Sequence, residues 1–193
     1  KEKMMPCYEK AKKMLGANPS PQIGKADKCL REVGKEIRGE DTFHKNDVGI
    51  FFGTPKETVP DPYFNGKGPD RTGCDFCGSC MVGCPSGDKN TLDKNYLHLA
   101  EALGVKIIPE TEVTGVTPLN GGYEIFTRKS TGIFRPKKTY RAKGAVFSGG
   151  VLGSVKLLMK CKQQGLLPKI SDQLGNLVRT NSEALLGVKS YDK

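Results

Sequence analysis

The chain of 193 residues has no tryptophan, only two histidines and no long apolar run. Its longest apolar stretches, residues 48–52 and 145–147, are far shorter than the roughly 20 residues of a transmembrane helix. The lysine-rich start also lacks the apolar core of a secretory signal. We therefore expect a soluble, cytoplasmic protein without a transmembrane segment.

The cysteine content argues against a disulfide framework. The chain has seven cysteines, an odd number, and four of them are bunched between residues 74 and 84. Such usage is typical of a reducing compartment. Cys7, Cys29 and Cys161 stand singly within helical patterns, where a buried and inert thiol is the common outcome, and we expect no site at them.

Acidic residues are in the minority. Lysine and arginine number 31 against 21 aspartates and glutamates, which gives a formal net charge of +10. This excess favours anionic partners such as nucleotides and phosphate groups. The basic residues are spread along the chain, however, and their densest cluster, residues 135–138, has no interleaved aromatic side chains. We expect a solvated basic face and no nucleic-acid partner.

The fingerprint G-x-G-x-x-G is absent, so the sequence does not support a self-sufficient dinucleotide site. A weaker nucleotide signal is present at Gly149 and Gly150, which stand between an apolar segment, residues 144–148, and a helical pattern, residues 151–162. Missing side chains let a ligand approach the backbone, and a helix N-terminus favours phosphate. Plain strand-to-helix packing demands the same kind of turn, and both interpretations stay open.

The sharpest chemical signal is the run of Cys74, Cys77, Cys80 and Cys84, which Pro85 follows directly. The spacing C-x2-C-x2-C-x3-C-P is the one with which bacterial ferredoxins hold iron–sulfur clusters, and it favours a [4Fe-4S] cluster. Four thiolates could also hold zinc in a closed tetrahedral site. A cysteine-rich loop without metal is the third interpretation.

Hydrophobic periodicity predicts an α/β chain that is in part of α+β type. Helical patterns cover residues 7–15, 26–37, 91–103 and 151–162. Strand-like apolar segments cover residues 48–52, 105–108 and 144–148. An antiparallel three-stranded meander is predicted from residues 112–116, 122–128 and 134–142. A long irregular stretch, residues 53–88, contains the cysteine run. Because it is polar and rich in glycine, we expect a metal or a neighbouring domain to supply its order.

Six segments together carry a resemblance to a known family. They are VPDPYF at residues 59–64, the cysteine run, KNTLDKNYL at 89–97, PETEV at 109–113, SGGVLGS at 148–154 and VRTNSE at 178–183. In this order they resemble the glucose-methanol-choline (GMC) flavoprotein oxidoreductases, in the bacterial cholesterol-oxidase-like branch. Compared with that family, the chain looks like an internal fragment without the N-terminal G-x-G-x-x-G unit and the C-terminal catalytic segment. Asp88 also departs from the family pattern, and it adds negative charge beside the cysteines.

The resemblance implies a partial FAD-binding nucleotide fold with an inserted meander and part of a substrate domain. It implies that Val113 meets the adenine ring through its backbone, and that Ser148, Gly149 and Gly150 lie against the adenosine and ribose end of FAD. An ordinary strand residue is the alternative for Val113. The implied division is 1–53 in the substrate or cap region, 54–90 as the cysteine-rich loop with the candidate metal site, 91–170 as the partial FAD-binding domain with the meander, and 171–193 as the start of a substrate-domain segment.

The implied reaction is hydride transfer from the carbinol carbon of a small-molecule alcohol, such as a sterol, to FAD. A cluster at the cysteine run would relay electrons to an external acceptor. The family's catalytic histidine belongs to a segment without a match here, so the catalytic residues stay unknown and we expect the isolated chain to be inactive. His44 and His98 lie outside that context and are expected to be surface or core residues. A ferredoxin-like electron-transfer module without flavin and a zinc-stabilised binding domain stay open as alternatives.

Overall fold

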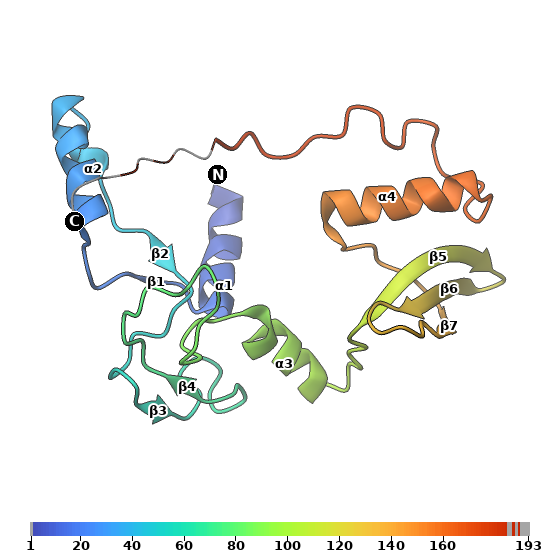
Figure 1. The fold of residues 1–193 in the computed structure, drawn as a ribbon, viewed down its shortest axis with the longest axis horizontal. Coiled ribbons are helices and arrows are strands. Elements are labelled where there is room, and N and C mark those ends of the chain that lie inside the picture. Colours follow the sequence, from blue (N-terminus) through green and yellow to red (C-terminus); the bar gives the residue numbers. More distant parts are fainter. Residues whose placement is uncertain (1, 185–186, 188, 190–193) are drawn as a thin grey trace. The chain divides into compact units, whose positions relative to one another are not determined.

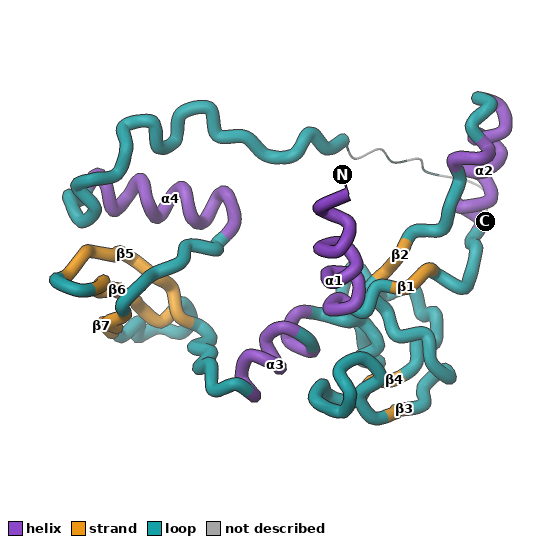
Figure 2. Tube along the Cα trace, turned by 180° about the vertical axis from the view of Figure 1, so that it is seen from behind, coloured by secondary structure: helices purple, strands orange, loops and turns teal. Residues whose placement is uncertain are grey.

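The computed structural model describes residues 2–184, 187 and 189 (Figure 1). The chain divides into two compact units, unit 1 (Lys1–Ile107) and unit 2 (Ile108–Lys193). Both units contain helices and antiparallel strands, which confirms the predicted mixture of helix and strand (Figure 2). The predicted substrate-domain segment at 171–193 lies in part outside the described residues.

Unit 1 combines helices with two short antiparallel strand pairs. Its helices are α1 (Met5–Leu15), α2 (Lys25–Glu36) and α3 (Tyr96–Ala102). Short 3-10 helices lie at Glu2–Met4, Glu40–Thr42 and Leu92–Lys94. Strand β1 (Asn18–Pro19) pairs with β2 (Asp47–Val48), and β3 (Thr58–Val59) pairs with β4 (Arg71–Thr72). The helix predicted over residues 91–103 is interrupted at Asn95, whose φ of −126° and ψ of −92° are not helical. The Asn95 side chain instead accepts the Tyr96 N–H at 2.6 Å and so caps the start of α3.

The long irregular stretch of unit 1 is held together by a buried guanidinium group. Arg71 is only 1% exposed. Its Nε donates to Oδ1 of Asn90 at 2.8 Å, and its two terminal nitrogens donate to the carbonyl oxygens of Pro69 at 2.6 Å and Lys94 at 2.7 Å. The guanidinium also lies over the Tyr63 ring, 5.6 Å from its centroid. Arg71 therefore joins the middle of the stretch to the segment that leads into α3.

A second charged side chain orders the neighbouring turn. The Asp61 carboxylate accepts four backbone N–H groups, from Tyr63, Phe64, Gly66 and Gly68, at 2.9 to 3.0 Å. Burial alone would raise the pKa of Asp61, but these four donors lower it below its ordinary value. We expected a metal or a neighbouring domain to order the irregular stretch. In the structure, hydrogen bonds of Arg71 and Asp61 within the chain order it.

Unit 2 is a three-stranded antiparallel sheet with one helix packed on it. The strands are β5 (Thr111–Leu119), β6 (Gly122–Lys129) and β7 (Lys137–Ala142), in the order β5-β6-β7, and the helix is α4 (Gly150–Gln163). In Figure 1, α4 lies along β5, and the two elements are in contact. Val116 of β5 is 1% exposed and Cys161 of α4 is fully buried, so the small core of this unit lies between the sheet and the helix.

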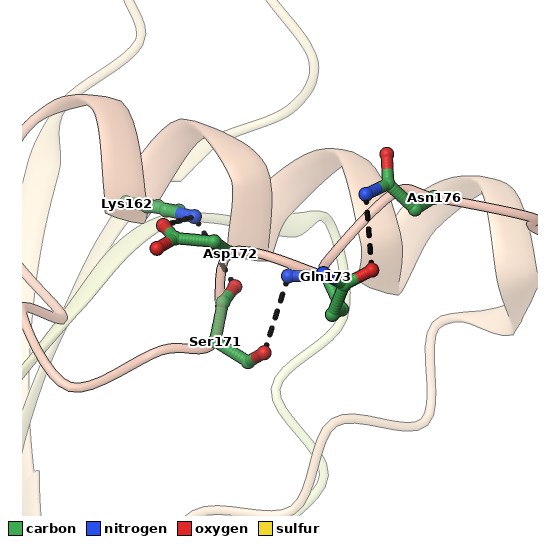
Figure 3. Close-up of polar contacts among 5 residues, drawn as sticks. All are labelled: Lys162, Ser171, Asp172, Gln173 and Asn176. Atoms are coloured by element: carbon green, nitrogen blue, oxygen red, sulfur yellow. Dashed lines mark hydrogen bonds and ion pairs between the residues drawn. The ribbon is translucent and has the colours of Figure 1, made fainter.

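The segment that follows α4 is tied back to the helix by polar contacts (Figure 3). The ammonium group of Lys162 donates to the carbonyl oxygen of Ser171 at 3.2 Å and to Oδ1 of Asp172 at 2.6 Å. Farther along, the N–H of Gln173 donates to the Ser171 hydroxyl, and the Asn176 amide donates to the Gln173 side chain. These bonds turn the chain back along the end of α4 after it leaves the helix.

Three strand predictions are wrong in whole or in part. The segment at 48–52 contributes only its first residue to a strand, and the segments at 105–108 and 144–148 are not strands. A strand needs a neighbour for its backbone N–H and C=O groups. Within the described ranges, no other strand pairs with either of these two segments. Apolar composition alone was therefore insufficient to make them strands.

Few apolar side chains of the described residues are fully buried. The buried apolar positions are Cys74, Val116 and Cys161, whereas many large apolar side chains are exposed in both units. None of the described helices combines the length and the hydropathy that are needed to cross a lipid bilayer.

Candidate functional site

Unit 2 contains a cleft of about 760 Å³ between its sheet and α4. The cleft is lined by Glu112, Val113, Val116, Ile125 and Arg128 of the strands, by residues 144–149, and by Gly153, Ser154, Lys156, Leu157 and Lys160 of α4. Ligand pockets in proteins have volumes of roughly 300–1,000 Å³. The cleft is therefore large enough for a ligand of nucleoside size.

The strand wall of the cleft combines apolar side chains with the charged pair of Glu112 and Arg128, and it is irregular. Val116 is buried at its base, and Val113 is 37% exposed nearer the mouth. The pairing of β5 with β6 shifts by one residue between Val113 and Gly115, so Thr114 is the extra residue of a β-bulge. A bulge bends its strand and changes the direction of neighbouring side chains. It leaves Val113 accessible from the cleft at the point where the regular alternation of β5 is broken.

The opposite wall begins with a glycine turn at the start of α4. The N–H of Gly149 donates to the Ser154 hydroxyl at 3.0 Å, and Gly150 has a φ of +70°, in the left-handed region that favours glycine. A Cβ atom added at Gly144, Gly150 or Gly153 would have no atom within 4 Å. No side chain caps the N-terminus of α4. The turn therefore leaves open space beside backbone groups that can bind an anion.

The charged groups of the cleft give it a positive balance. Arg128 is paired with Glu112, with two nitrogen–oxygen distances of 2.7 and 3.1 Å. The hydrogen bond from Arg128 lowers the pKa of Glu112 below its ordinary value, and the nearby charge of Lys160 lowers it further. Lys156 and Lys160 lie one turn apart on α4 and line the same cleft. With one negative and three positive side chains, the site favours an anionic ligand.

The structure brings most of the predicted cofactor residues together. Val113, Ser148 and Gly149 line this one cleft, although they come from β5 and from the segment before α4. Gly150 follows directly as the first residue of α4. Val113 and Ser148 therefore line the same cleft, although they are 35 positions apart in the sequence.

Sequence reasoning missed the polar groups of the same cleft. The hydroxyl of Ser154 was not considered as the partner of the glycine turn, and Lys156 and Lys160 were not recognised as cleft residues. The signals were present in the sequence, because lysines four residues apart share one helix face. The pairing of Glu112 with Arg128 could not be found in this way, because a regular hairpin that turns at residues 120–121 would place Glu112 opposite Lys129. The bulge at Thr114 shifts the register by one residue.

The cysteine run does not form a metal site in this structure. Within residues 2–184, 187 and 189, no group of three or more histidine, cysteine, aspartate or glutamate side chains is placed to hold a metal ion. Cys74 is buried, Cys77 is exposed, and Cys80 and Cys84 are half-buried. The iron–sulfur and zinc predictions for Cys74, Cys77, Cys80 and Cys84 are therefore not supported.

The chemistry of the individual thiols also disfavours a ligand set. Metal binding requires the thiolate form. Burial raises the pKa of the Cys74 thiol to about 11, and the neighbouring Asp88 carboxylate raises it further. The Cys84 thiol donates a hydrogen bond to this same carboxylate, which is only 2% exposed. Burial and the Asp88 carboxylate thus favour the protonated form of the Cys74 thiol.

The two histidines belong to unit 1. His44 is exposed, and its Nδ1 lies 3.0 Å from the carbonyl oxygen of Thr42. His98 is half-buried on α3. Neither histidine lines the cleft of unit 2.

Comparisons with known proteins show which family the chain is similar to. Residues 67–165 match the family described as GMC oxidoreductase. The chain is 45% identical to a cholesterol oxidase of Acinetobacter baumannii over 204 residues, which cover 100% of this chain and 37% of that protein. It is also 45% identical over 191 residues to cholesterol oxidases of two strains of Mycobacterium tuberculosis, covering 95% of this chain and 33% of theirs. No solved structure matches the chain significantly.

The chain spans about a third of the length of these relatives. The family match covers the β5–β6–β7 sheet and α4, and therefore the whole cleft. Because the match includes more than half of the sequence and the identity extends over nearly all of it, the chain belongs to the GMC oxidoreductase family.

Proposed function

We propose that the chain is part of an FAD-dependent oxidoreductase that acts on CH–OH groups, and that the cleft of unit 2 holds the adenosine end of FAD. The observation that carries this proposal is the convergence of Val113, Ser148 and Gly149 on one cleft of nucleoside size with a positive balance of charge. Family membership supports it independently, since GMC relatives of this chain are named as oxidases.

The residues of the cleft fit such a ligand. Val113 would pack against the adenine ring, and Ser148 with Gly149 would lie beside the ribose, where the open glycine backbone leaves room for close approach. Lys156 and Lys160 would attract the phosphate groups. When bound, FAD would supply the hydride acceptor for an alcohol carbon and pass the electrons to an external acceptor.

The substrate we propose is a bulky apolar alcohol such as a sterol, because the relatives are cholesterol oxidases by name. On this proposal β5–β6–β7 is the meander inserted into the FAD-binding domain at 91–170, and the segments at 1–53 and 171–193 belong to the substrate domain. The cysteine run takes no part in the proposed reaction.

The proposal can be tested by titrating ADP into the 193-residue chain and measuring the heat of binding. We expect saturable binding that Lys160→Glu weakens about ten-fold, because a negative side chain would replace a positive one beside the phosphates. The matched control is Lys169→Glu, an exposed lysine of the same unit outside the cleft, which should bind ADP like the unchanged chain. Equal effects of the two variants, or no saturable binding, would contradict the proposal.

A further inference from the structure

The turn between β6 and β7 presents two large apolar side chains to solvent. Ile133 is 95% exposed and Phe134 is 89% exposed. Gly132, with a φ of +84°, turns the backbone just before them. We call residues 130–136 the hairpin tip. Adjacent exposed apolar side chains at the end of a hairpin are unfavourable in water and indicate a surface that is covered in use.

Basic side chains surround the hairpin tip. Arg135, Lys137 and Lys138 are exposed, and we call these three residues the basic collar. No carboxylate within the described part of the chain lies within 4 Å of their charged groups as an ion pair. Lys138 instead lies over the Tyr140 ring, 4.9 Å from its centroid. The collar therefore presents a positive charge that no ion pair among the described residues neutralises.

A shallow hollow of about 310 Å³ adjoins the hairpin tip. Lys129, Lys137 and Lys138 line it together with Tyr140. Lys129 is paired with Glu110 at 3.6 Å, but both side chains are about half exposed, so this pair is weak and open to exchange. The hollow thus offers several ammonium groups to an anion close to the apolar pair.

We propose that the hairpin tip docks the protein on an anionic phospholipid membrane. Ile133 and Phe134 would enter the boundary between headgroups and acyl chains, and the basic collar would remain at the level of the lipid phosphates. Clustered lysines and arginines are attracted by the negative surface of such a leaflet. The proposal requires neither flavin nor the cleft of unit 2.

The shape of the hairpin tip favours a membrane over a protein partner. Stable protein interfaces bury roughly 800 Å² on each side and use complementary surfaces. Two side chains at the end of one turn offer much less area than this, and they project from it instead of lining a groove. A fluid bilayer adapts to a projecting apolar pair and needs no matching pocket.

The absence of tryptophan provides a direct test. The variant Phe134→Trp places a single indole at the hairpin tip of the whole chain, and its emission is measured with phosphatidylcholine vesicles that lack or contain about one third phosphatidylserine. We expect a blue shift with the anionic vesicles only. The matched control is Leu103→Trp in unit 1, a position that is 87% exposed and should show no shift. Unshifted emission of Phe134→Trp with anionic vesicles would overturn the proposal.

A second experiment separates the basic collar from the general positive charge of the chain. Arg135, Lys137 and Lys138 are changed together to Glu, and vesicle co-sedimentation is compared with a triple control of equal charge change, Lys10→Glu, Lys13→Glu and Lys28→Glu in unit 1. We expect the collar variant to lose about 100-fold in affinity for anionic vesicles and the control to lose only a few-fold. Far-UV circular dichroism of both variants verifies that they fold.

Two outcomes would reject this role of the collar. Equal losses in the two triple variants would show that net charge alone attracts the chain to the vesicles. Binding of the unchanged chain to a polyglutamate peptide, without binding to anionic vesicles at low salt, would show that acidic protein segments and not membranes are the partner. Weaker vesicle binding at high salt is expected under the proposal, because the collar acts through charge.

Discussion

Arg71 is the buried charge on which the irregular part of unit 1 depends. Its guanidinium is 1% exposed and donates to Asn90, Pro69 and Lys94. These acceptors are partly buried, so water can replace the lost donor only in part. A group of this kind stabilises its surroundings mainly because its removal leaves several polar atoms unpaired.

We therefore expect Arg71→Met to lower the free energy of unfolding by about 3 kcal/mol, although methionine retains much of the apolar stem. The measurement is urea denaturation followed by circular dichroism. The control is Arg31→Met, because Arg31 is 53% exposed and its ion pair with Glu40 has a distance of 3.4 Å. That variant should lose at most about 1 kcal/mol. Similar losses in both variants would show that Arg71 does not organise the stretch.

Cys74 gives the folded chain a dependence on alkaline pH. Burial raises the pKa of its thiol from 9.0 to about 11. Between pH 9 and pH 11 the folded state therefore keeps the thiol proton, whereas the unfolded state has released it. The contribution of this thiol to the free energy of unfolding is complete below about pH 9, and it is lost as the pH rises towards 11. We expect the free energy of unfolding to decrease by about 2 kcal/mol across this window.

The pH effect is isolated by comparing variants, because lysines and tyrosines titrate in the same range. Cys74→Ala should flatten the decrease in the free energy of unfolding relative to the unchanged chain. Cys77→Ala should not, since Cys77 is exposed. Parallel pH curves for the unchanged chain and Cys74→Ala would mean that the buried thiol does not control this dependence.

At the scale of elements, helices were easier to predict than strands. The helix predicted at 151–162 corresponds to α4 (Gly150–Gln163), because its apolar spacing and glycine start are local features. The segments at 105–108 and 144–148 have the composition of buried strands but are not strands. Whether such a segment pairs depends on a neighbour elsewhere in the chain, which its own sequence does not specify.

The candidate site was predictable to a similar degree. The family resemblance indicated Val113 and Ser148, and both line the cleft. Lys156 and Lys160 were missed because lysines are common on solvent-exposed helix faces. The sequence does not show that this face of the predicted helix lines a cleft. The cysteine run predicted a metal site that the structure does not support. Its spacing specifies the type of ligand but not whether the side chains converge on one point. Local order there comes from Arg71 and Asp61, whose partners are mostly backbone groups that a sequence does not distinguish.

At the scale of the whole molecule, no described residue that lines the cleft of unit 2 is suited to act as a general base. Its titratable groups among the described residues are Glu112, Arg128, Lys156 and Lys160. Arg128 holds the pKa of Glu112 below its ordinary value, so that carboxylate is a weak proton acceptor. A general base is most effective when its pKa lies near the working pH. On the proposed function, we therefore expect a group outside this cleft to remove the proton from the alcohol.

On the proposed function, the 193-residue chain should thus bind FAD without oxidising an alcohol. We expect the chain mixed with FAD and cholesterol to give no product above the background of free FAD, whereas a protein extended to the full length of its relatives should give product. The measurement is cholestenone formation by chromatography, with Lys160→Glu as a control that weakens FAD binding. Turnover by the 193-residue chain that Lys160→Glu abolishes would show that a catalytic base lies within it. Such a result would direct the search to His98 and His44 of unit 1, because imidazole is the side chain that titrates near neutral pH.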